Sequence, residues 1–101
     1  MHDAAQQRAE VAQRLLAEQR VEADRLLMDG AKQLRENGDL LNAEERKAFE
    51  EQLVRLSALA KTETDHEALK NAITEVDGLA RPFVERIMDR AIGKAAVGHR
   101  M

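Results

Sequence analysis

The stretch RLLAEQRVEADRLL, residues 14–27, decides the fold class of this chain. Its apolar residues recur at steps of three and four, as on one face of an α-helix, and charged residues fill most of the other positions. The apolar stripe extends beyond the stretch at both ends and comprises Ala5, Ala9, Ala12, Leu16, Ala23, Leu27, Ala31 and Leu34. The pattern therefore predicts one long helix from about residue 4 to residue 37.

The composition favours an all-α fold. The chain has 101 residues, of which 35% are charged, two are aromatic and none is cysteine. Good helix formers dominate the rest, while glycine and proline are sparse. This length suffices for one small domain with a limited core. The lack of cysteine excludes a disulfide framework and a thiolate metal site.

The length of the first helix predicts the architecture. A helix over residues 4–37 extends about 50 Å, so its two ends cannot both sit in one small core. Its first half also carries fewer large apolar residues than its second half. We therefore expect residues 1–20 to project, residues 21–97 to form a small antiparallel helical bundle, and residues 98–101 to form a tail.

Helix-start signals place the first two helices of this bundle at about 21–37 and 43–60. Asn42 and Glu45 have the spacing of a capping box, in which each side chain accepts a hydrogen bond from the other residue's backbone N–H. Thr64 and Glu67 repeat this spacing and predict a second box before the next helix.

Proline interrupts the apolar face of the last segment. Pro82 has no N–H to donate to the carbonyl of Gly78, so a kink or a break is expected there. We expect helices at about 65–77 and 81–96, as two separate helices or as one bent helix. Short loops between these segments are typical of helices that pack side by side.

The pattern offers few candidates for chemistry. Glu63 and His66 have the Glu-x-x-His spacing of a di-iron site, but neither a second such motif nor two further Glu on facing helices is evident. No glycine-rich nucleotide motif is present. We therefore expect neither a metal nor a cofactor, and the Glu63–His66 pair is interpreted as part of a solvated helix cap.

Three cations near the C-terminus share a helix face, Arg86, Arg90 and Lys94. They could bind phosphate, or they could form a solvated face near a helix end. A net charge of −3 argues against general nucleic-acid binding. There is no apolar run of about 20 residues and no apolar signal segment, so neither a membrane span nor secretion is expected, and a cytoplasmic protein is predicted.

Three stretches together resemble one protein family. LAEQRVEADRLL (16–27), GDLLNAEERKAFEEQL (38–53) and RIMDRAIGKAAVGH (86–99) occur in the order and spacing of the C-terminal helical lid of the seventy-kilodalton heat-shock chaperones. The last stretch looks most like the HscA branch, which serves iron–sulfur cluster assembly. The resemblance covers about residues 10–99, and its strength lies in the joint order of the stretches.

The resemblance implies a function that is not enzymatic. In that family an ATPase domain precedes a β-sandwich that grips an extended peptide, and the helical lid covers the sandwich and slows client release. This chain would be that lid, without the ATPase domain and the sandwich. Its partners would be the sandwich and, indirectly, a client, which the HscA likeness suggests is an iron–sulfur scaffold protein.

The resemblance also suggests two contact residues. Asp24 matches the position where some members place a latch carboxylate facing an arginine of the sandwich. Met28, one turn later, stands where other members have histidine, which predicts a weaker or more apolar contact. The alternative for Asp24 is an ordinary exposed carboxylate.

Two further hypotheses remain open at the level of sequence. The chain could be a stand-alone helical adaptor that binds partner proteins through the first helix. In either case the exposed first half of that helix predicts pairing of two copies of the isolated chain.

Overall fold

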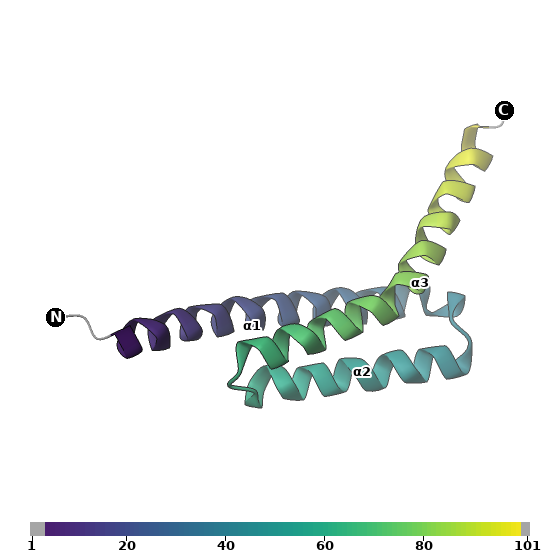
Figure 1. Cartoon of the computed structure of the whole chain (residues 1–101). Helices are drawn as coiled ribbons and strands as arrows, with labels where there is room; N and C mark the ends of the chain where they lie inside the picture. The colour runs from purple at the N-terminus through teal and green to yellow at the C-terminus, as the bar shows by residue number, and fades with distance from the viewer. Residues whose placement is uncertain (1–3, 100–101) are drawn as a thin grey trace.

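Three helices and one short 3₁₀ turn make up the computed structural model, which describes residues 4–99 and the side chains of residues 7–93. They are α1 (Ala4–Asn37), η1 (Gly38–Leu40), α2 (Ala43–Thr62) and α3 (His66–His99) (Figure 1). Each helix runs antiparallel to the one before it, and residues 4–99 contain no strand. The predicted all-α fold, a long leading helix followed by a small antiparallel bundle, is confirmed.

The core lies where the three helices face one another. Its buried residues are Ala23 and Leu34 from α1, Phe49, Leu53, Leu56 and Ala60 from α2, and Leu69, Val76, Ala80 and Phe83 from α3. The rings of Phe49 and Phe83 pack edge to face, with centroids 5.9 Å apart and planes at 74°. Each large apolar side chain buried in this way contributes about 1.5–3 kcal/mol, so this stripe holds the bundle together.

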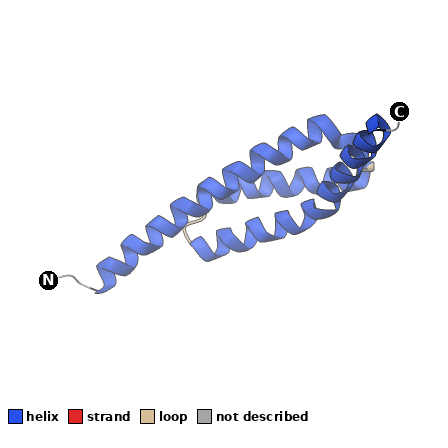
Figure 2. Cartoon of the chain, turned by 90° about the horizontal axis from the view of Figure 1, so that it is seen from above, coloured by secondary structure: helices blue, strands red, loops and turns tan. Residues whose placement is uncertain are grey.

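Helix α1 joins the bundle somewhat earlier than the predicted residue 21. Leu16 is half-buried and packs against the core, and the guanidinium of Arg20 donates to the Glu63 carbonyl oxygen at 3.5 Å. The first turns of α1 extend past the ends of α2 and α3 (Figure 2). The projecting segment is therefore shorter than residues 1–20.

Helix α3 is one bent helix, which is one of the two forms that the sequence left open for residues 65–77 and 81–96. Pro82 lies inside the helix. The proline removes one N–H and crowds the carbonyl of Gly78, which bends the helix, while the neighbouring hydrogen bonds carry it through. The part of α3 after the bend turns away from the bundle (Figure 1).

This turn exposes residues that the sequence pattern places on a buried face. Ala91 is exposed, and 63% of Ile92 is accessible to solvent. Met88 and Val84, about one and two turns before Ile92, are exposed as well. The apolar stripe thus continues along α3 beyond the point where the helix leaves the core.

The predicted cap of α2 is present. The side chain of Asn42 accepts from the Glu45 N–H at 2.8 Å, and the Glu45 carboxylate accepts from the Asn42 N–H at 3.0 Å. These reciprocal bonds satisfy two donors that the first turn of the helix leaves without partners.

The predicted cap of α3 by Thr64 is wrong. Helix α3 begins at His66, so Asp65 occupies the capping position, and its carboxylate accepts from the Glu67 N–H at 3.1 Å. Aspartate caps a helix at least as well as threonine, and its charge suits the positive end of the helix dipole. The Glu63 carboxylate accepts from the N–H groups of Thr64 and Asp65 and completes the turn.

The predicted tail at 98–101 lies partly within the described residues. Gly98 and His99 are helical, and Arg100 and Met101 lie outside the described residues. Over the described part of the chain, no helix combines the length and the apolar character needed to span a membrane.

Gly30 and Gly78 lie in contrasting surroundings within their helices. A Cβ atom on Gly30 would lie 3.0 and 3.1 Å from the two methyl groups of Leu53, so α1 and α2 approach each other closely there. A Cβ atom on Gly78 would meet nothing within 4 Å. A side chain at residue 30 would therefore press on Leu53, whereas residue 78 has room for one.

We expect Gly78→Ala to raise the free energy of unfolding by up to about 1 kcal/mol, because alanine suits a helix interior better than glycine. Gly30→Ala should stabilise the chain less than Gly78→Ala, because the methyl group of alanine at residue 30 would press on Leu53. Gly30→Val should lose about 1–3 kcal/mol through overpacking. Urea unfolding followed by circular dichroism measures all three variants. A Gly30→Val variant as stable as the unmodified chain would contradict the close approach.

Candidate functional site: the outward face of helix α1

Asp24 and Met28 lie on the side of α1 that faces away from the bundle. Their neighbours Ala23 and Gly30 are buried against the other helices. Asp24 is exposed, and 74% of Met28 is accessible to solvent. Within the described residues, the Asp24 carboxylate makes no hydrogen bond or ion pair. The fold therefore places both residues side by side on one free surface, one turn apart.

Val21 extends this surface by one turn and is 57% exposed. Because Val21, Asp24 and Met28 are spaced by three and four residues, they share one side of the helix. We call these three residues the outward face. It combines two apolar side chains with one carboxylate, which suits contact with another protein surface that carries a cation.

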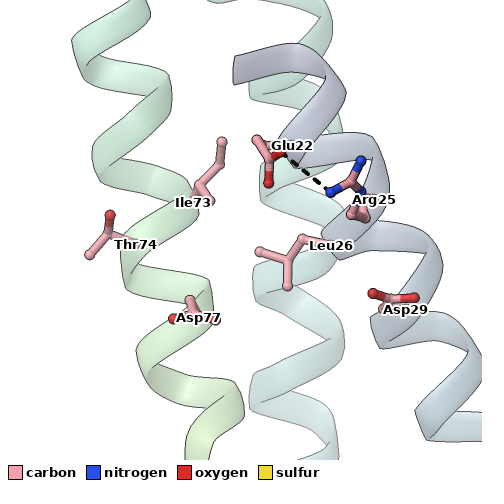
Figure 3. Close-up of a pocket in the computed structure, with 7 residues that line it drawn as sticks. All are labelled: Glu22, Arg25, Leu26, Asp29, Ile73, Thr74 and Asp77. Carbon is pink, nitrogen blue, oxygen red and sulfur yellow. Dashed lines mark ion pairs between the residues drawn. The ribbon is translucent and has the colours of Figure 1, made fainter. Parts of the chain in front are cut away.

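A shallow groove runs beside this face, between α1 and α3 (Figure 3). Its lining residues are Glu22, Arg25, Leu26, Asp29, Ile73, Thr74 and Asp77. Leu26 and Ile73 are half-buried and point into the space between the helices. Arg25 pairs with Glu22 at 3.7 Å, which leaves the carboxylates of Asp29 and Asp77 on the rim. Within the described residues, no group of three His, Asp or Glu is arranged to hold a metal ion.

Glu63 and His66, the pair with di-iron spacing, have separate surroundings. The Glu63 carboxylate accepts two backbone N–H groups in the turn before α3. His66 starts α3 and lies beside Val11 and Leu15 of α1. Glu63 therefore serves the turn, and His66 lies against the side of α1.

Arg86 connects α3 to the corner between α1 and α2. Its guanidinium donates to the Leu40 carbonyl oxygen at 3.1 Å and to both oxygens of Glu45 at 2.9 Å. The Glu45 carboxylate also accepts from the Asn42 N–H in the capping box of α2, so one carboxylate serves two functions. Bidentate pairs of this kind fix orientation as well as distance.

Arg90 repeats this contact one turn further along α3. Its guanidinium donates to the two oxygens of Asp39 at 3.1 and 2.6 Å. We call the pairs Arg86–Glu45 and Arg90–Asp39 the corner clamp. Two of the three cations proposed as a phosphate-binding stripe are thus paired with carboxylates, and the side chain of Lys94 lies outside the described residues.

Sequence reasoning missed the corner clamp, because its partners are 41 and 51 residues apart. A usable signal was present, since two acidic residues flank the predicted turn before α2 and two arginines follow the proline of α3. An antiparallel three-helix order brings these two regions together.

The hydrogen bond from Arg86 lowers the pKa of Glu45 from 4.5 to about 2, with help from the Asn42 N–H. The same bond raises the pKa of Arg86 above its ordinary value. Above pH 4.5 Glu45 is ionised in the folded and the unfolded chain, and the contact contributes fully to stability. Between pH 4.5 and 2 the unfolded chain takes up the proton first, so this contribution is lost as the pH falls.

We expect Glu45→Gln to lower the urea midpoint of unfolding at pH 7, because it removes the charge opposite Arg86. The difference in urea midpoint between Glu45→Gln and the unmodified chain should narrow below pH 4.5 and disappear near pH 2. Circular dichroism at a series of pH values measures it. Glu51→Gln, at an exposed position of α2, is the control and should change little. A difference that is independent of pH would contradict the assignment.

Comparison with known proteins identifies relatives among chaperones. The chain is 41% identical over 88 residues to a chaperone protein HscA homolog from Cupriavidus metallidurans, and 42% identical over 86 residues to one from Mannheimia succiniciproducens. It is 41% identical over 92 residues to the chaperone protein HscA of Cronobacter sakazakii. No protein-family model matches the chain. No solved structure matches it either.

These alignments cover 85–89% of this chain but only 14% of each of these three relatives. The alignments therefore cover most of this chain but only a small part of each relative. Over most of its length, this chain is a homologue of one segment of the HscA chaperones.

Proposed function

We propose that this chain is the helical lid of a chaperone's substrate-binding domain. The observation that carries the proposal is that α1 has an outward face that the bundle does not use, in a chain homologous to a segment of HscA chaperones. A lid helix needs one side to hold its own bundle and another side to meet the peptide-binding sandwich. Buried Ala23 and exposed Asp24 belong to such opposite sides.

The action of the lid is kinetic. When closed, it blocks the exit of a bound client peptide from the β-sandwich, and ATP binding in a separate ATPase domain opens it. The chain itself performs no chemical step in this scheme. The likeness to HscA makes an iron–sulfur scaffold protein the favoured client, in the cytoplasm.

The outward face supplies the contact in this scheme. Asp24 would pair with an arginine of the sandwich, while Val21 and Met28 would pack against its apolar surface. The exposure of Met28 supports an apolar contact at this position. An exposed ion pair contributes about 0.2–1 kcal/mol, so the lid would close reversibly.

Peptide release tests the proposal. The peptide-binding β-sandwich of an HscA chaperone is prepared alone and joined to this chain, and a labelled client peptide is chased with unlabelled peptide. We expect much slower release with the chain attached. Equal release rates would reject the lid and favour the stand-alone adaptor.

Asp24→Ala tests the latch in the same assay. It should speed release by up to about five-fold, the equivalent of about 1 kcal/mol. Glu51→Ala is the matched control, because it removes an exposed carboxylate from α2, away from the outward face. Equal effects of the two variants would contradict a specific role of Asp24.

The isolated chain should also pair with a second copy of itself, because the first part of α1 would lack its partner. Val11 lies in that part and is 49% exposed. Sedimentation should show dimers at high concentration that Val11→Ser weakens. Val54→Ser, on α2, is the control and should not weaken them. Monomers alone at high concentration would contradict this prediction.

A further inference from the structure

We propose that the corner clamp locks the bend of α3, so that the part of the helix after Pro82 keeps one angle to the bundle. This inference does not depend on the proposed lid function. It assigns a conformational role to Arg86, Arg90 and their two acidic partners.

The backbone of α3 is easy to bend near Pro82. Because the proline has no N–H for the carbonyl of Gly78, one backbone hydrogen bond of the helix is missing. Gly78 is exposed, and no atom lies within 4 Å of the position a Cβ would take. Neither the local hydrogen bonds nor packing around Gly78 therefore sets the angle firmly.

The contacts after the bend show which part of the helix is packed against the core. Phe83 is buried and Ile87 is half-buried against the core, so packing fixes the first turn. Ala91, Ile92 and Gly93 are exposed. Past Arg90, up to the last described side chain, the helix has left the core.

The corner clamp fixes the direction of this helix. Arg86 and Arg90 lie four residues apart, which corresponds to about 6 Å along the axis. A single contact would let the helix rotate about it, whereas two contacts one turn apart fix the direction of the helix axis. Both arginines reach the same corner, Arg86 through Leu40 and Glu45 and Arg90 through Asp39.

The lock is reversible, because its ion pairs are only partly buried. The side chains of Arg86 and Glu45 are 41% and 37% exposed. Salt screens exposed charges, so the clamp should loosen as ionic strength rises. The angle of the distal part of α3 would then vary while the core stays packed.

Distances between spin labels test this proposal directly. The chain has no cysteine, so Val54→Cys and Ile92→Cys introduce the only attachment sites, both on exposed positions. The pair Val54→Cys and Leu79→Cys is the internal reference, because Leu79 precedes the bend. Ile92 lies about 15 Å beyond Pro82, so a swing of 20° would move it by about 5 Å.

The test variant combines Glu45→Gln and Asp39→Asn. Glutamine can replace glutamate in a capping box, so the start of α2 keeps its cap while the charges opposite both arginines are lost. Glu50→Gln is the matched control, because it also removes one carboxylate from an ion pair, and that pair joins Glu50 to Arg46 within α2.

In the test variant, the distance between residues 54 and 92 should broaden or shift by about 5 Å, while the reference distance stays fixed. Glu50→Gln should leave both distances unchanged. An unchanged 54–92 distance in a folded test variant would overturn the proposal and assign the angle to packing at Phe83 and Ile87.

If the test variant does not fold, the labelled chain without these substitutions supplies the answer. Raising the salt concentration to about 1 M shortens the screening length to about 3 Å. Broadening of the 54–92 distance alone supports the lock. No change in that distance would overturn it.

Discussion

The length of α2 is the constraint on which the rest of this structure depends. Helix α2 has 20 residues, whereas α1 and α3 have 34 each. A core can extend only as far as all three helices lie together, so both longer helices must leave it. They leave at opposite ends, α1 with its first turns and α3 with its last (Figure 1). The exposed apolar residues Val11 and Ile92 belong to these two overhangs.

Local signals in the sequence predicted the local features well. The helical period gave α1, and the spacing of Asn42 and Glu45 gave the cap of α2, because both depend on residues within one or two turns. The cap of α3 was predicted wrongly, because two neighbouring residues compete for that position and Asp65 takes it in place of Thr64. At Pro82 the sequence left a bend and a break open, and the helix bends.

The sequence reasoning did not find the tertiary contacts, which join residues far apart in the chain. Arg86 and Arg90 looked like a free cationic stripe until the fold placed Glu45 and Asp39 opposite them. Asp24 and Met28 of the outward face were suggested by a family resemblance and not by the sequence pattern. The structure adds that both are exposed. The two regions are separate on the molecule, so contact at α1 and orientation of α3 can be altered independently.

The pair of Phe49 and Phe83 has a spectroscopic consequence. The chain contains neither tryptophan nor tyrosine, so these two rings are its only aromatic chromophores. They belong to α2 and α3 and touch each other edge to face. Any near-ultraviolet dichroism of this protein therefore arises from these two rings in their packed surroundings. Its fine structure reports the docking of α3 on α2, separately from the far-ultraviolet signal that reports helix content.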